Sequence, residues 1–323
     1  MADPNFVHPE LVEILANLDR PSGMLTEEGV PAARARSRVL SQKWLTPGSV
    51  MPTKHILTRD SGDLDVWYFQ SQQNGADAPC MVWFHGGGFV MGQGRDIWFG
   101  QLFSEFASCN VLSVEYRLAP EHRAPAAVED GLAALEWLHE NADFLGVDRN
   151  KILIGGASAG AGVAAGLALM NRDRGGPSVA MQLLLYPMLD RRHLSASHLT
   201  KDYPIWWREQ SLSCWSMYLG DDPNDSVIQY AAAAEAVDLS GLPPARSFVG
   251  TTDLFHDEVE AYHRRLIEHG VDSQFRSYGG MFHCGEVVGS QTSIGIQMCQ
   301  DYVDVVARQV GAQPKRLSTA HFT

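Results

Sequence analysis

A serine flanked by small residues lies where a predicted strand gives way to a predicted helix. The segment Gly156-Ala-Ser-Ala-Gly160 has the pattern G-x-S-x-G and follows the apolar run Lys151–Gly155. A sharp strand-to-helix turn holds such a serine in a strained backbone conformation, which bulky neighbours would prevent. It also puts the serine Oγ at a helix N-terminus, where the helix dipole favours developing negative charge. The pattern predicts that Ser158 is a nucleophile, although a plain tight turn gives the same residues.

The same stretch also resembles a dinucleotide-binding turn. Gly160-Ala-Gly-Val-Ala-Ala165 fits the fingerprint G-x-G-x-x-A after a strand. That fingerprint requires its first glycine in the turn itself and an acidic residue at the tip of the next strand. Gly160 instead falls inside the predicted helix, and the next strand ends at Tyr186-Pro187. The sequence therefore favours a nucleophile over a nicotinamide or flavin site, and we expect no cofactor.

A second glycine-rich segment follows another predicted strand. The apolar run Cys80–Phe84 ends directly in His85-Gly-Gly-Gly88. Consecutive glycines let backbone N–H groups point into a site instead of into a sheet ladder, and such donors stabilise the oxyanion of a tetrahedral intermediate. A flexible loop is the alternative, but the presence of Ser158 favours an oxyanion-binding loop. His85 is then expected to fix the loop and not to act as a base.

An aspartate and a histidine follow two later predicted strands. Asp253 comes after one apolar run and His283 after the next. Because the C-terminal ends of parallel strands meet at one edge of a sheet, both side chains are expected beside Ser158, in the chain order Ser…Asp…His. The alternatives for Asp253 are a helix cap or a metal site shared with His256 and Asp257. No second group of ligands accompanies that cluster, so we expect no metal.

The elements that must position these residues alternate between strands and helices. The predicted strands are residues 54–59, 64–69, 80–84, 111–115, 151–155, 181–186, 246–250 and 273–278. The predicted helices are residues 129–140, 158–172, 257–269 and 290–308. Such alternation predicts an α/β fold with a mostly parallel eight-stranded sheet flanked by helices, in which the first two strands are antiparallel.

Two segments interrupt the alternation. Residues 1–45 and 191–230 have helical or irregular patterns, and the second segment is rich in tryptophan. We expect them to pack together as a helical cap domain over one end of the sheet. Residues 46–190 and 231–323 are then expected to form the catalytic domain.

Several aromatic or apolar side chains are candidates for the wall of a substrate pocket. They are Phe89, Trp206, Trp207 and Trp215, together with Phe6 and Met24. The alternative is that these side chains only hold the cap together.

The composition excludes several classes of partner. Acidic side chains outnumber basic ones 38 to 25, giving a formal charge of −13, whereas nucleic acids and anionic membranes favour basic surfaces. No stretch approaches the roughly 18 apolar residues of a membrane span, and the first residues lack the features of a secretory signal. The five cysteines include no CxxC pair, which indicates reduced thiols. The sequence predicts a cytoplasmic protein with a small-molecule partner and no stable membrane insertion.

Six segments resemble, in order, the motifs of the bacterial hormone-sensitive-lipase-like esterases, lipolytic family IV of the α/β-hydrolase fold. They are His85–Phe89, Val114–His122, Pro125–Asp130, Tyr186–Asp190, Asp238–Pro244 and Asp253–Glu258. The resemblance implies a catalytic triad of Ser158, Asp253 and His283. It also implies an oxyanion hole made of the backbone N–H groups of Gly87, Gly88 and Ala159. A cap built from the N-terminal segment and the insertion before Tyr230, and a capacity to form a homodimer, are further implications.

The surroundings of the serine depart from the family pattern at three positions. Ala157 replaces the usual aspartate or threonine before the nucleophile, and Ala161 replaces a second glycine after it. The usual His-Gly-Phe segment becomes His283-Cys-Gly285. No catalytic group is lost, so we expect these changes to affect substrate preference and rate and not the type of reaction.

The predicted reaction is hydrolysis of a carboxylic ester through an acyl-enzyme intermediate. A closed aromatic cap favours short-chain or small aromatic esters over long lipids. An amidase, a lactonase or a specialised degradative esterase would use the same triad. A non-catalytic ligand-binding receptor is the remaining alternative, but the gibberellin receptors that resemble this family have lost the catalytic histidine, which is present here as His283.

Overall fold

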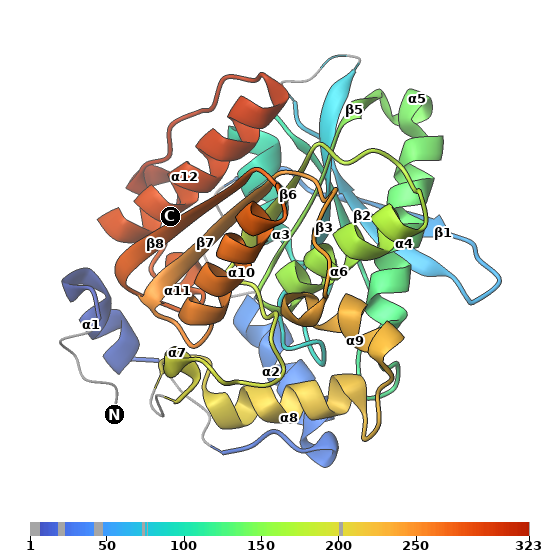
Figure 1. Ribbon diagram of the computed structural model, residues 1–323. Coiled ribbons are helices and arrows are strands. Elements are labelled where there is room, and N and C mark those ends of the chain that lie inside the picture. The colour runs from blue at the N-terminus through green and yellow to red at the C-terminus, as the bar shows by residue number, and fades with distance from the viewer. Residues whose placement is uncertain are drawn as a thin grey trace.

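The computed structural model describes residues 7–18, 23–41, 48–72, 75, 77–199 and 203–322 of the 323-residue chain. Eight strands in this part of the chain form a single sheet in the order β1-β2-β4-β3-β5-β6-β7-β8 (Figure 1). They are β1 (Thr53–Leu57), β2 (Leu64–Phe69), β3 (Ala78–Phe84), β4 (Asn110–Val114), β5 (Val147–Ala157), β6 (Met181–Leu185), β7 (Ala245–Thr252) and β8 (Ser273–Phe282).

The sheet is parallel except at its N-terminal edge. β2 pairs antiparallel with both β1 and β4, and every other neighbouring pair is parallel. Each residue of β3, β4 and β6 is buried, because helices cover both faces of the central strands and continuous apolar runs suit that position. The edge strand β8 instead alternates exposed and partly buried residues along its first half.

Helices flank this sheet (Figure 1). Outside the two segments expected to form a cap, the longer helices are α4 (Ala126–Glu140), α6 (Ala159–Asp173), α10 (His256–Glu268) and α12 (Ser293–Val310), with the short helices α3 (Ile97–Gln101), α5 (Ala142–Leu145) and α11 (Gly285–Val288). α6 packs on β3, β5 and β6, and α10 packs on β7 and β8. The predicted α/β-hydrolase fold, with a mostly parallel eight-stranded sheet and flanking helices, is confirmed.

Element ends differ from the predicted ones where local hydrogen bonds decide them. The last long helix begins at Ser293 and not at residue 290, because the Thr292 hydroxyl accepts a hydrogen bond from the Gly295 N–H at 3.1 Å and caps the helix. The strand before Ser158 starts at Val147, four residues earlier than its apolar run, because Val147 pairs with Ala78.

The two segments expected to form a cap contain several helices. These are α1 (Pro9–Ala16), α2 (Val30–Ser41), α7 (Ala196–Leu199), α8 (Arg208–Leu219) and α9 (Asp225–Ala231). In Figure 1, α2 and α8 lie below the sheet, and the Ser213 hydroxyl of α8 donates a hydrogen bond to the Leu25 carbonyl just before α2. α9 packs on α6 and ends at Ala231, so the predicted boundary at 230/231 falls at its last residue.

Arg34 ties α2 to the rest of the molecule. Its guanidinium group donates to the Val90 carbonyl at 2.7 Å and to the Ala119 carbonyl at 2.9 Å, and it pairs with Glu121 at 2.7 Å. This ion pair holds the pKa of Glu121 at about 2, well below its ordinary value. Two carbonyls and a carboxylate thus fix the orientation of α2 over the sheet.

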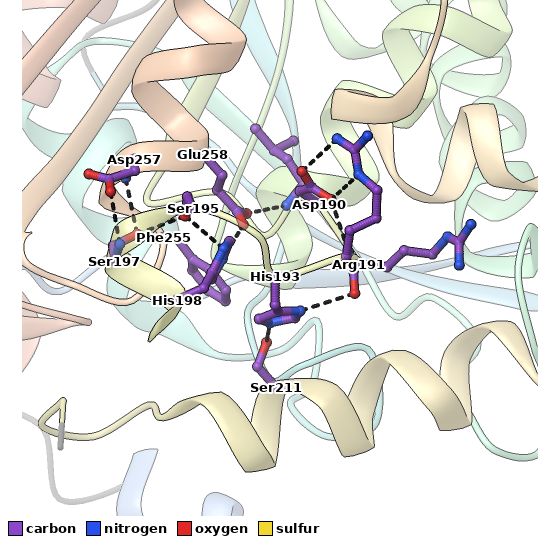
Figure 2. Close-up of polar contacts among 12 residues, drawn as sticks. Asp190, Arg191, His193, Ser195, Ser197, His198, Ser211, Phe255, Asp257 and Glu258 are labelled. Atoms are coloured by element: carbon purple, nitrogen blue, oxygen red, sulfur yellow. Dashed lines mark hydrogen bonds and ion pairs between the residues drawn. The ribbon is translucent and has the colours of Figure 1, made fainter. Parts of the chain in front are cut away.

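A buried polar network joins the segment before α8 to α10 (Figure 2). The Glu258 carboxyl accepts the Leu189 N–H at 2.7 Å and contacts His198 Nε2 at 2.6 Å, with both side chains inaccessible to solvent. Burial lowers the pKa of His198 to about 4 and raises that of Glu258, so both groups favour their neutral forms. Ser197 N–H donates to Asp257 at 2.8 Å beside this pair.

No helix in the described ranges is both long enough and apolar enough to cross a lipid bilayer.

Candidate active site

Ser158 stands at a tight turn between β5 and α6. Its backbone has φ 57° and ψ −123°, a conformation that a non-glycine residue adopts only under strain. A Cβ at Gly156 would overlap the backbone of Gly160, and a Cβ at Gly160 would overlap the Phe84 carbonyl. Glycine at both positions therefore lets strand and helix approach closely enough to raise Ser158 above the sheet.

Ser158, His283 and Asp253 form a continuous chain of hydrogen bonds. His283 Nε2 lies 2.9 Å from Ser158 Oγ, and His283 Nδ1 lies 2.9 Å from Asp253 Oδ2. All three side chains are at most 3% exposed. They follow β5, β7 and β8, whose C-terminal ends meet at one edge of the sheet, as the sequence predicts.

The aspartate fixes which nitrogen of the histidine carries the proton. Asp253 accepts the Phe255 N–H through Oδ1 at 2.9 Å and offers Oδ2 to His283. A carboxylate accepts only, so Nδ1 donates and Nε2 presents its lone pair to the Ser158 hydroxyl. This tautomer suits a base that removes the serine proton.

The loop after β3 lies against the serine. Gly86 and Gly87 border the same cavity as Ser158. Gly87 has φ 124°, and a Cβ there would overlap the Met91 carbonyl; Gly88 has φ 62° and packs against Trp206 and Cys214. Ala159 is the first residue of α6, so its N–H has no acceptor within the helix.

His85 holds this loop in place. Its Nδ1 donates to the Gly86 carbonyl at 2.8 Å, its ring stacks on Tyr116 at 4.2 Å between centroids, and the Tyr116 hydroxyl donates to the His85 carbonyl at 2.7 Å. Burial raises the pKa of Tyr116, which keeps this hydroxyl a donor.

A cavity of about 720 Å³ opens onto Ser158 and His283. Residues from both expected cap segments border it, among them Met24, Leu25, Ala33 and Leu40 from the first and Ile205, Trp206 and Gln210 from the second. Trp83, Trp98 and Phe99 contribute an aromatic wall.

Only part of the aromatic set predicted for the pocket borders this cavity. Trp206 does so and lies 6.0 Å from the His283 ring. Phe89 is buried behind the glycine loop, where it stacks on Tyr218 at 4.0 Å and lies 5.0 Å from Trp215. Neither Phe89, Trp207 nor Trp215 is among the described residues of the cavity wall. Met24 borders the cavity, and Phe6 lies outside the described residues.

Tyr186 and Glu286 lie beside the catalytic candidates, although neither was predicted to be a site residue. The Tyr186 ring borders the cavity and meets the His283 ring edge-on at 4.9 Å, and its hydroxyl donates to Glu286 Oε1 at 2.7 Å. Glu286 is inaccessible to solvent, and burial raises its pKa to about 7. An acidic residue three positions after His283, in a segment otherwise apolar, was the available signal.

We expect Glu286→Gln to gain stability relative to the unmodified protein as the pH rises. The folded protein holds a proton on Glu286 up to about pH 7, whereas the unfolded chain releases it near the ordinary value of 4.5. Deprotonation therefore lowers the free energy of unfolding as the pH rises through this window. The variant lacks that loss, so its stability relative to the unmodified protein should increase by about 2 kcal/mol between pH 5 and pH 8.

Urea unfolding at the two pH values measures this difference. Glu268→Gln, on the exposed end of α10, is the matched control and should show no pH-dependent gain. Equal stability differences at pH 5 and pH 8 for Glu286→Gln would contradict the expectation.

The metal alternative at Asp253 does not match the observed contacts. Asp253 points to His283, while His256 bonds Asp257 at 2.9 Å and Ser277 at 3.0 Å. No group of three histidine, cysteine, aspartate or glutamate side chains suited to a metal occurs in the described part of the chain.

The chain is similar to known proteins in both sequence and fold. A family model described as the α/β-hydrolase fold matches residues 81–286. Carboxylesterase NlhH of Mycobacterium tuberculosis is 34% identical over 300 residues, covering 88% of this chain and 91% of that protein. Carboxylic ester hydrolase LipN of the same organism is 32% identical over 304 residues, covering 87% and 77%. A solved structure of a bacterial heroin esterase is 31% identical, with a TM-score of 0.87 over 95% of this chain and 98% of that one.

The chain belongs to the α/β-hydrolase fold family. The resemblance to hormone-sensitive-lipase-like esterases is confirmed, and the enzyme class is that of the serine carboxylesterases.

Proposed function

We propose that Ser158 attacks the carbonyl carbon of a carboxylic ester and that the reaction proceeds through an acyl-enzyme. The observation that carries this proposal is the hydrogen-bonded chain from Ser158 Oγ through His283 to Asp253, open to the cavity. His283 takes the serine proton as the tetrahedral intermediate forms and donates it to the leaving alcohol. It then removes a proton from water, which attacks the acyl carbon, and returns that proton to Ser158 Oγ as the carboxylic acid is released.

The backbone N–H groups of Gly87, Gly88 and Ala159 are the proposed donors to the oxyanion. The left-handed backbone at Gly87 and Gly88 and the position of Ala159 at the start of α6 support this assignment. One such donor contributes about 3 kcal/mol to stabilisation of a tetrahedral intermediate. Asp253 stabilises the His283 cation that forms at the same time.

Short-chain or small aromatic esters are the proposed substrates. The cavity of about 720 Å³ is bordered by Trp83, Phe99 and Trp206, which suit compact apolar groups. We propose that residues 1–45 and 191–230 act as the cap that closes this cavity over a substrate, and that residues 46–190 and 231–323 form the catalytic domain. Two observations support that division. Side chains of α2 and Trp206 border the cavity, and Arg34 of α2 donates a hydrogen bond to the Val90 carbonyl.

A series of p-nitrophenyl esters with acyl chains from acetate to palmitate tests this proposal. We expect kcat/KM to be highest for chains of about two to eight carbons and to fall by about tenfold or more for twelve carbons and beyond, since the aromatic walls beside Ser158 suit compact acyl groups. Hydrolysis of the amide acetanilide is measured beside the esters, because an amidase would use the same triad. Preference for the longest chains contradicts the proposed substrate class, and hydrolysis of none of the esters contradicts the proposed reaction.

A further inference from the structure

A buried carboxyl beside the catalytic candidates has no part in the proposed reaction. Glu286 lies in α11 and is inaccessible to solvent. Its Oε1 accepts the Tyr186 hydroxyl at 2.7 Å, whereas Oε2 has no hydrogen-bond partner among the described residues. Burying a carboxyl with so few partners is costly. The hydrogen bond to Tyr186 is therefore the contact through which Glu286 can act.

Tyr186 carries this contact to the base. Its ring is 1% exposed and meets the His283 ring edge-on, with the centroids 4.9 Å apart and the planes at 70°. Phe255 also meets the His283 ring edge-on, at 5.3 Å, and the Trp206 ring lies at 6.0 Å. Trp206 Nε1 has no hydrogen-bond partner among the described residues. Of these three rings around the imidazole, Tyr186 is thus the one that a side-chain hydrogen bond holds in place.

The turn after β8 connects the carboxyl to the base. Cys284 has a left-handed backbone, with φ 56° and ψ 21°, and its carbonyl accepts the Val287 N–H at 3.1 Å. A non-glycine residue keeps such a conformation only where surrounding contacts hold it. His283 and Glu286 belong to this one short turn. The bond from Glu286 to Tyr186 therefore joins the turn after β8 to the end of β6, across the intervening strand β7.

The base needs such support because its two hydrogen bonds leave one motion open. His283 Nδ1 faces Asp253 and Nε2 faces Ser158, each at 2.9 Å. These bonds do not by themselves fix the tilt of the ring about the line through the two nitrogens. A packed neighbour restricts that tilt, and displacing a catalytic group by about 1 Å can lower a rate by about 100-fold.

We propose that Glu286 and Tyr186 are positioning residues for the base: the Glu286 carboxyl anchors the Tyr186 hydroxyl, and the anchored ring holds the His283 imidazole against Ser158. This inference rests on the proposed ester hydrolysis at Ser158 and adds two residues to that site. Neither residue transfers a proton in the reaction.

Three single variants test the anchor in p-nitrophenyl acetate hydrolysis. Tyr186→Phe removes the hydroxyl and keeps the ring that borders the cavity. Its kcat should fall by about tenfold or more while KM stays within about threefold, because the cavity wall remains but the base is no longer held. Glu286→Leu should show the same difference between kcat and KM. Glu286→Gln, whose amide oxygen can accept the Tyr186 hydroxyl, should recover most of the rate lost in Glu286→Leu.

The double variant Tyr186→Phe/Glu286→Leu separates positioning from stability. Because one hydrogen bond joins the two side chains, its kcat should equal that of either single variant instead of combining both losses. Glu286→Leu leaves the buried Tyr186 hydroxyl unpaired, whereas the double variant removes both partners. The double variant should therefore unfold at a higher urea concentration than Glu286→Leu and still hydrolyse the ester slowly.

Tyr278→Phe is the matched control. The Tyr278 hydroxyl donates to Asp301 Oδ2 at 2.7 Å, a bond of the same kind and length, and Tyr278 is not among the described residues of the cavity wall. This variant should keep the kcat of the unmodified protein whatever stability it loses.

Unchanged kcat in Tyr186→Phe and Glu286→Leu, or losses that multiply in the double variant, would overturn the inference. So would an equal loss of kcat in Tyr278→Phe, or a Glu286→Gln variant as slow as Glu286→Leu. Failure of the unmodified protein to hydrolyse any ester, p-nitrophenyl acetate included, instead overturns the proposed function.

Discussion

Ser158→Ala is expected to lower kcat for p-nitrophenyl acetate by about 10⁶-fold, the scale seen when the nucleophile of such a triad is removed. The substitution takes away only the Oγ that faces His283 Nε2 at 2.9 Å. The turn itself depends on backbone contacts, since Ser158 N–H donates to the Leu185 carbonyl at 2.9 Å. Steady-state kinetics measure the loss, and the residual rate measures the contribution of the proposed oxyanion donors and of substrate binding.

The fold should survive this change. Alanine fits the space of serine, and the thermal unfolding midpoint should stay within a few degrees of that of the unmodified protein. Ser247→Ala is a matched control, because Ser247 is equally buried in β7 and its hydroxyl has no hydrogen-bond partner among the described residues. That variant should retain full activity. Substantial turnover by Ser158→Ala at unchanged stability would remove Ser158 from the mechanism.

The second large effect is expected for Asp253→Asn, with kcat lower by about 10⁴-fold. The Asp253 oxygens accept from the Phe255 N–H and from His283 Nδ1. An asparagine that keeps its oxygen on the Phe255 N–H must turn its NH₂ group toward Nδ1. The histidine then carries its proton on Nε2 and cannot accept the proton of Ser158.

Asp257→Asn provides the comparison for this variant. Asp257 Oδ1 lies 2.9 Å from His256 Nδ1 in an aspartate–histidine pair outside the cavity wall, and its replacement should change kcat by less than about threefold. Rates are best followed across a range of pH, because hydroxide at high pH can replace the base that the wrong tautomer of His283 no longer provides. A loss of less than tenfold in Asp253→Asn would show that Asp253 does not control the tautomer of His283.

Sequence patterns predict the sheet and the order of its reactive groups because both depend on local features. Buried central strands such as Met181–Leu185 are unbroken apolar runs, and Ser158, Asp253 and His283 each follow a strand directly. The strained turn at Ser158 is predictable for the same reason, since only glycine at 156 and 160 permits it.

The wall of the cavity was less accessible to prediction because tertiary packing decides which side chains reach it. Trp206 and Trp215 are both buried tryptophans of the proposed cap, yet of these two only Trp206 borders the cavity. Phe89 neighbours the glycine loop in sequence, but its backbone at φ 64° turns the ring toward Tyr218. Asp96 and Glu286 do not belong to a recognised motif. The position of α3 brings Asp96 to the cavity wall, and the position of α11 brings Glu286 to the Tyr186 hydroxyl.

Ser158 follows β5, which is remote in sequence from β7 and β8, the strands that Asp253 and His283 follow. Ser158 and His283 are 125 residues apart, and β6 and β7 must both be in place between β5 and β8 before the two side chains meet. On the proposed mechanism, any partly folded form that lacks the C-terminal half of the sheet contains the nucleophile Ser158 but not its base His283. Hydrolytic activity therefore counts fully assembled molecules, and in a refolding experiment its recovery marks completion of the sheet, whereas helix content measured by circular dichroism returns as soon as individual segments form.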